Sequence, residues 1–102
     1  MRDVRLSKNF NEELTALLLQ GLDRFGSRVI EQKRALVYNT IENFLVHFPV
    51  RPIDQKLGIY TYPVTNTPFV LLYDFDDAEL RIHLIIHGGS DRTMINLASI
   101  RW

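Results

Sequence analysis

The sequence contains no cysteine among its 102 residues. Because disulfides, thiolate nucleophiles and cysteine-ligated zinc all require this residue, the sequence excludes all three. None of its apolar runs approaches the roughly 18 residues that a membrane-spanning helix needs. The first residues, Met-Arg-Asp-Val-Arg-Leu, lack the apolar core of a signal peptide. We therefore expect a cytoplasmic protein that does not contact a membrane.

The sequence also lacks net charge, since 12 basic side chains balance 12 acidic ones. A protein that binds nucleic acid mainly through phosphates usually carries a basic excess, so this balance argues against that class and leaves room only for a local basic patch. A hydrophobic content of 46% is typical of a chain with a packed core. Residues 1–102 suffice for a single domain. We expect no cofactor.

The clearest local pattern lies between Pro68 and His87, where two apolar runs flank a short acidic turn and predict a β-hairpin. A loop centred on Asp77 and Ala78 pairs Phe75 with Leu80, Tyr73 with Ile82, Leu71 with Leu84 and Phe69 with Ile86. Because side chains alternate along a strand, these eight share one face, which we expect to be the core face. The other face would carry the charge pair Asp74 and Arg81, together with Val70, Leu72, His83, Ile85 and His87.

The rest of the sequence predicts an α+β fold with the element order β-α-α-β-β-β. The expected elements before the hairpin are a strand from Asp3 to Leu6, a helix that ends at Gly26, a longer helix from about Arg28 to Phe48, and a strand from Leu57 to Val64. Helix-capping residues from Ser7 to Asn11 precede the first helix, and Pro49 ends the second. We expect a helix hairpin packed on a mainly antiparallel sheet of three or four strands.

These features together resemble the RelE/ParE superfamily of toxins from bacterial type II toxin–antitoxin systems. The resemblance extends over almost the whole chain and is carried by Val-Arg-Leu-Ser near the start, His-Phe-Pro after the helices, Phe-Val-Leu-Leu-Tyr-Asp-Phe, and Leu-Arg-Ile-His-Leu-Ile-Ile-His-Gly-Gly-Ser-Asp-Arg. ParE-like proteins typically close their last strand with a similar His-Gly, a small residue, and Arg or Asp. The resemblance implies a growth-arresting toxin that forms a hetero-oligomer with a cognate antitoxin.

Within the superfamily, the chain is closer to ParE-like than to RelE-like members. RelE-like toxins cleave messenger RNA on the ribosome and place an arginine early in the third strand, where this chain has Val70. Where they carry an arginine and then a tyrosine near the end, this chain has Ser90 and then Ile95 or Asn96. We therefore expect a ParE-like, non-enzymatic poison of DNA gyrase that aids plasmid stabilisation. The alternative is a RelE-like, ribosome-dependent mRNA endonuclease.

The alternative activity would need a base, an acid and cations near the scissile phosphate. The candidates are His83, His87, Arg92, Lys56, Tyr60 and Tyr62. His83 and His87 are expected on the same strand face. An ordinary structural role is the favoured interpretation of both, because strand histidines are usually half-buried and have their hydrogen bonds met by neighbouring groups. No third ligand accompanies the two histidines, so we expect no metal.

Candidate binding residues cluster toward the end of the chain. Two glycines precede Asp91 and Arg92, and these two residues with Arg101 and Trp102 are the candidates for target binding. The half-apolar sheet face and the tail supply the candidates for antitoxin binding, namely Val70, Leu72, Ile85, Met94, Ile95 and Leu97. The alternative is that the tail folds back and covers this face itself. The acidic residues from Asp74 to Glu79 are expected to form a solvated turn.

Overall fold

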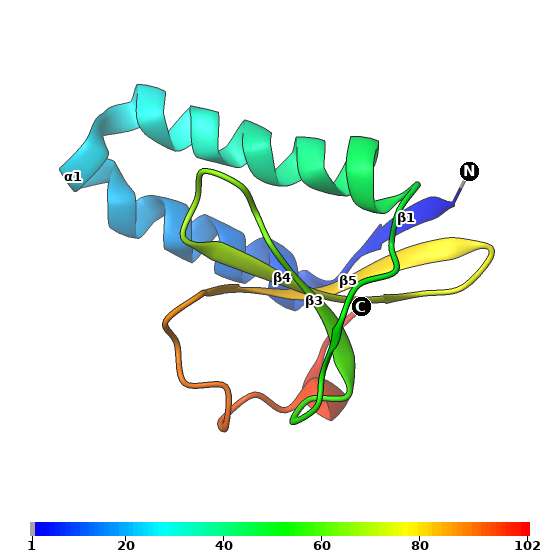
Figure 1. Ribbon diagram of the computed structural model, residues 1–102. Helices are drawn as coiled ribbons and strands as arrows, with labels where there is room; N and C mark the ends of the chain where they lie inside the picture. Colours follow the sequence, from blue (N-terminus) through cyan, green and yellow to red (C-terminus); the bar gives the residue numbers. More distant parts are fainter. Residues whose placement is uncertain (1) are drawn as a thin grey trace.

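The computed structural model describes residues 2–102 and shows a helical layer packed on one face of a five-stranded sheet (Figure 1). The elements are β1 (Asp3–Leu6), α1 (Lys8–Asn39), η1 (Thr40–Leu45), β2 (Ile53–Asp54), β3 (Ile59–Pro63), β4 (Phe69–Phe75), β5 (Glu79–His87) and η2 (Leu97–Ser99). The strand order is β1-β5-β4-β3-β2, with β1 parallel to β5 and all other pairs antiparallel. The predicted α+β class is confirmed. The expected strand number was too low, because β2 adds a two-residue pairing to β3.

The start of α1 is tied to the sheet by one residue, Ser7. Its buried hydroxyl accepts a hydrogen bond from the Phe10 N–H at 2.8 Å, which satisfies one of the free donors of the first helical turn. The same hydroxyl donates to the His83 carbonyl at 2.6 Å, and the Ser7 N–H donates to the neighbouring Ile82 carbonyl at 3.1 Å. The helix therefore begins at a fixed position on β5.

The expectation of two separate helices was wrong, because α1 is a single 32-residue element that runs directly into the six-residue π-helical segment η1. Its direction changes at one residue, Gly26, with φ 80° and ψ 164°, a conformation essentially restricted to glycine. The N-terminal and C-terminal arms of α1 then lie side by side, since the rings of Phe10 and Tyr38 are 6.4 Å apart (Figure 1). The sequence located the break but predicted a helix end there instead of a one-residue kink.

The main core lies between α1 and the sheet. From the helical layer it receives Phe10, Leu14, Leu18, Ile30, Val37, Ile41 and Leu45, and from the sheet Phe69, Leu71, Tyr73, Leu80, Ile82 and Ile85. The Tyr73 hydroxyl donates to the Pro49 carbonyl at 2.7 Å, which fixes the chain after η1. Burial raises the pKa of Tyr73 far above its ordinary value, so the hydroxyl stays protonated and keeps donating.

The pairing of β4 with β5 follows the predicted register only near the turn. Phe75 faces Leu80, Asp74 faces Arg81 and Tyr73 faces Ile82, as expected. The register then shifts by one residue, so that Leu72, and not Leu71, faces Leu84. His83 is the extra residue, which makes this a β-bulge. The predicted pairs of Leu71 with Leu84 and of Phe69 with Ile86 were therefore wrong.

The bulge changes which side chains face the helix, because a one-residue slip moves every later side chain to the other face. Ile85, which was expected on the face away from the helices, is fully buried in the main core. Leu84 and Ile86, which were expected in that core, lie on the opposite face with Val70 and Leu72. The sheet therefore has a second apolar face, called here the far face, formed by Ile59, Val70, Leu72, Leu84 and Ile86.

The far face is covered by the chain's own tail. Ile95 and Leu97 pack against it. The end of the tail is bonded to the start of α1, where the Lys8 N–H donates to the Arg101 carbonyl at 2.7 Å and the Arg101 N–H donates to Asn9 Oδ1 at 2.8 Å. Of the two arrangements that the sequence left open, the structure has the one in which the tail folds back over the sheet.

We predict that Ile85→Ala lowers the free energy of unfolding by about 2–5 kcal/mol, because the truncation leaves a cavity in a fully buried position. The matched control is Leu19→Ala on α1, where the side chain is 61% exposed and the expected change is within about 0.5 kcal/mol. Urea titration measures both. A loss of less than about 0.5 kcal/mol for Ile85→Ala would place this side chain outside the core.

Candidate functional site

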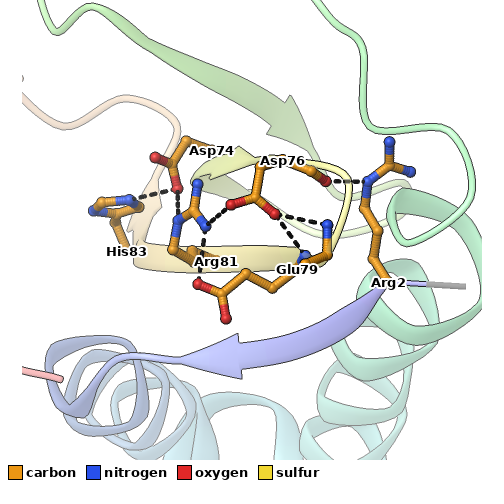
Figure 2. A network of polar contacts seen from close by, with 7 residues as sticks. Arg2, Asp74, Asp76, Glu79, Arg81 and His83 are labelled. Carbon is orange, nitrogen blue, oxygen red and sulfur yellow. Dashed lines mark hydrogen bonds and ion pairs between the residues drawn. The ribbon is translucent and has the colours of Figure 1, made fainter.

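Arg81 lies at the centre of the main polar cluster of the sheet, beside the β4–β5 turn (Figure 2). Its Nε donates to Asp74 Oδ1 at 2.8 Å, and its Nη1 contacts both Asp76 Oδ2 and Glu79 Oε1 at 2.9 Å. These carboxylates raise the pKa of Arg81, so its charge is permanent. Of the acidic residues that were expected to form a solvated turn, Asp74, Asp76 and Glu79 are thus bonded to Arg81, and Asp77 is exposed.

The carboxylates of this cluster are held in their charged form. The hydrogen bond from Arg81 is the main reason that the pKa of Asp76 falls to about 2, and bonds from the Glu79 and Ala78 N–H groups add to it. Burial raises the pKa of Asp74, but bonds from Arg81 and His83 outweigh burial and leave it below its ordinary value. Neither carboxyl group can therefore act as a general acid near neutral pH.

His83 is held in place by its neighbours. Its Nε2 lies 3.0 Å from Asp74 Oδ1, and its ring packs edge-on against Trp102 with the centroids 4.8 Å apart. Its Nδ1 is buried without a hydrogen-bond partner among residues 2–102. The side chain is only 16% exposed. His83 therefore has a carboxylate and an indole beside it, and little of its side chain is accessible to a substrate.

His83 and His87 lie on opposite faces of the sheet, and the expectation of a shared face was wrong because the bulge separates them. His83 lies on the far-face side beside Trp102, whereas His87 lines a cavity between the sheet and α1. His87 is exposed, and its Nδ1 accepts a hydrogen bond from the Gly89 N–H at 3.3 Å. The two histidines therefore cannot act together as an acid and a base on one substrate.

The remaining catalytic candidates are also engaged by their neighbours. Arg92 Nη1 contacts Asp54 Oδ2 at 2.6 Å, and this bond is the main reason that the pKa of Asp54 lies below its ordinary value. Tyr60 packs against the rings of Tyr73 and Phe75, with centroids 5.7 and 5.1 Å away. Arg92 and Tyr60 thus belong to different environments.

The candidate target-binding residues are distributed over two places. Asp91 accepts hydrogen bonds from the N–H and hydroxyl of Thr93 at 2.9 and 2.8 Å, which shapes the exposed loop that also holds Arg92. Arg101 contacts Glu12 and Asn9 of α1. The indole of Trp102 lies under the guanidinium of Arg5, 5.0 Å from the ring centre. The structure brings Arg101 and Trp102 together and separates them from the loop.

The candidate antitoxin-binding residues do not form one accessible surface. Val70 and Leu72 are buried in the far face, where Ile95 and Leu97 of the tail cover them. Ile85 is in the main core, and Met94, at 86% exposure, points to solvent. A partner that contacts Val70 or Leu72 would first have to displace the tail.

The sequence reasoning gave the helical pair as the alternative place for a partner, and the structure shows an apolar surface there, beside the kink of α1, whose residues were not singled out. It consists of the exposed side chains of Leu19, Leu22 and Phe25 and is called here the kink surface. Arg24 and Lys33 lie near the Phe25 ring, 5.5 and 5.8 Å from its centre. A signal for it was present, because Leu17, Leu18 and Leu19 are consecutive and cannot all face the core from one helix.

A cavity of about 270 Å³ adjoins the kink surface. Its apolar lining includes Leu17, Phe25, Ile30 and Phe69, and its polar lining includes the cations Arg24 and Lys33 together with His87. The lining of this cavity contains no carboxylate among residues 2–102. The cavity and the Phe25 side of the kink surface therefore match a partner segment that carries apolar and acidic side chains, whereas Leu19 and Leu22 line a neighbouring pocket with both Glu31 and Arg34.

Comparisons with protein-family models and with curated proteins found no match to this chain. No helix within residues 2–102 is both long enough and apolar enough to cross a membrane. Over the same residues, no three acidic or histidine side chains converge in a group that could hold a metal ion. The function must therefore be argued from the surfaces described above and from the resemblance of the sequence.

We predict that Asp76→Asn makes stability less sensitive to acid. The pKa of Asp76 is lower in the folded chain than its ordinary value of 3.8, so its charge stabilises the fold at pH values above 3.8. This contribution is lost as the pH falls toward about 2. Asparagine can still accept the turn hydrogen bonds of Asp76, so the variant removes mainly the charge. Urea titration at several pH values should show a shallower loss of stability for the variant. Asp77→Asn, which lies in the same turn, should keep the original slope, and an unchanged slope for Asp76→Asn would contradict the assignment.

Proposed function

We propose that this protein is the toxin of a type II toxin–antitoxin system, of the ParE type, which halts growth through DNA gyrase and is neutralised by a cognate antitoxin. The observation that carries the proposal is the kink surface, an exposed apolar area with basic residues beside it on a chain without net charge. Such a surface is typical of a protein-binding site. The resemblance of the sequence to the RelE/ParE superfamily indicates that the partner is an antitoxin.

The arrangement of the candidate catalytic residues favours a binding protein over the RelE-like alternative. A ribonuclease needs a base, an acid and cations around one phosphate. In this chain His83 is enclosed by Asp74 and Trp102, and His87 is on the opposite face. The far face, beside which His83 lies, is apolar and covered by the tail. These contacts leave no open site in which the candidates meet.

The antitoxin is proposed to bind at the kink surface instead of the far face. The far face is closed by Ile95 and Leu97, so binding there would require the loss of contacts that the chain already makes. The kink surface requires no such loss, because Leu22 and Phe25 are already exposed. Arg24 and Lys33 favour a segment with acidic residues beside its apolar ones.

The proposal predicts that the purified chain inhibits gyrase supercoiling and leaves messenger RNA intact in a ribosome-loaded translation assay. Addition of the protein encoded beside it should restore supercoiling. Phe25→Asp should still inhibit gyrase but should no longer be neutralised, because the charge disrupts the kink surface and repels an acidic partner. The matched control is Met94→Asp, an exposed apolar position in the tail that should still be neutralised.

The same experiment separates the proposal from its alternative. Cleavage of messenger RNA that is abolished by His83→Ala or His87→Ala would overturn the proposal in favour of the RelE-like activity. Loss of neutralisation with Met94→Asp but not with Phe25→Asp would show that the antitoxin binds at the tail, as the sequence predicted.

A further inference from the structure

A second cationic site lies at the opposite end of the helical layer from the kink, where the chain leaves η1. An open pocket of about 400 Å³ is lined there by Arg2, His47, Phe48, Pro49, Val50 and Arg51. Two of these six side chains are arginines and a third is a histidine, and the lining has no carboxylate among residues 2–102. On a chain without net charge, this clustering produces a local positive potential.

Arg51 is fixed in place but not neutralised. Its guanidinium carbon lies 4.8 Å from the centre of the Phe44 ring and 5.2 Å from that of Tyr62. Its Nε is buried and has no hydrogen-bond partner among residues 2–102. Over the same residues no carboxylate forms an ion pair with it. An arginine that is held against two rings and forms no ion pair suits a multivalent anion such as a phosphate group, which its Nη groups rather than the buried Nε would contact.

Arg2 is positioned in a comparable way by the backbone. Its Nε donates to the Asp76 carbonyl at 2.6 Å and its Nη1 to the Val46 carbonyl at 3.4 Å, and its guanidinium lies over the Phe75 ring. Figure 2 shows the end of the Arg2 side chain pointing away from the carboxylates of the Arg81 cluster. The carboxylate of Asp76 pairs with Arg81 at 2.9 Å, so it does not neutralise the charge that Arg2 contributes to the pocket.

Phe48 gives the pocket an exposed aromatic surface. Its side chain is 63% exposed, although its ring packs against Phe44 at 5.8 Å and against His47 at 6.3 Å. Val50, at 69% exposure, adds an apolar edge. A supported ring with a free side is the arrangement on which a nucleic-acid base stacks, and the volume lies in the range of small-ligand sites.

We propose that this pocket binds a nucleotide, with its phosphate between Arg51, Arg2 and His47 and its base on the ring of Phe48. The source of the nucleotide is either a free mononucleotide or a nucleotide within a single strand, since both present a phosphate beside a base. The site is on the helix side of the sheet, apart from the kink surface, so its existence does not depend on the toxin proposal.

Amide chemical shifts of the full chain, followed during titration, test the proposal directly. Adenosine 5′-monophosphate should shift the amides of His47, Phe48, Val50 and Arg51 with a Kd of about 1 mM or lower. Adenosine at the same concentration should leave them in place, because it lacks the phosphate. A single-stranded RNA tetranucleotide that binds more tightly than the mononucleotide identifies a strand as the source, and equal affinity identifies the free nucleotide.

Three variants assign the roles within the pocket. Phe48→Ala should weaken binding by about fivefold to a hundredfold through the lost stacking, and Arg51→Gln by about tenfold or more through the lost charge. Because Arg51 also packs on core rings, His47→Gln at an exposed position gives a second test of phosphate contact that leaves this packing intact. Arg28→Gln, at an exposed position of α1 outside both proposed sites, is the matched control and should not change the affinity.

Several results would overturn the proposal. One is the absence of shifts at His47, Phe48 and Arg51 with the mononucleotide, and another is equal binding of adenosine. A third is binding of an acidic peptide at these residues without any binding of the nucleotide, which would assign the pocket to a protein partner. Unchanged affinity in both His47→Gln and folded Arg51→Gln would likewise show that these side chains do not contact the phosphate.

Discussion

The contact of Ser7 with two consecutive carbonyls of β5 is the constraint on which the rest of this fold depends. The Ser7 N–H bonds to Ile82 and its hydroxyl to His83, and the same hydroxyl caps α1. His83 is the extra residue of the β-bulge, so the start of the helix and the irregularity of the strand stabilise each other. This contact determines which side chains of β5 face α1 and which face the tail.

Both faces of the sheet are closed as a result. Helix α1 covers the face that holds Ile85, and the tail covers the face that holds Leu84 and Ile86. A chain of 102 residues gains from covering both faces, because a small domain has little apolar surface to bury. Two of the surfaces that remain open lie at the two ends of the helical layer, namely the kink surface and the pocket beside η1. These two places are the ones for which we propose interactions.

The sequence predicted the parts of the structure that have a regular period. Alternation located β4 and β5 and correctly paired Asp74 with Arg81 beside the turn. Alternation does not reveal an extra residue, so the pairs beyond His83 were assigned to the wrong partners. Gly26 marked a break in the helical pattern, but a glycine does not distinguish a helix end from a kink. Of the candidate site, the sequence found His83 and Trp102 as residues but not their contact, which the bulge and the folded tail create.

The most direct test of this account is a measurement of methyl contacts by nuclear Overhauser effects in a chain with labelled isoleucine, leucine and valine. The account predicts contacts of Ile85 with side chains of α1, and contacts of Leu84 and Ile86 with Ile95 and Leu97 of the tail. Contacts of Leu84 and Ile86 with α1, and of Ile85 with the tail, would contradict it, because they would mean a regular hairpin without the bulge at His83.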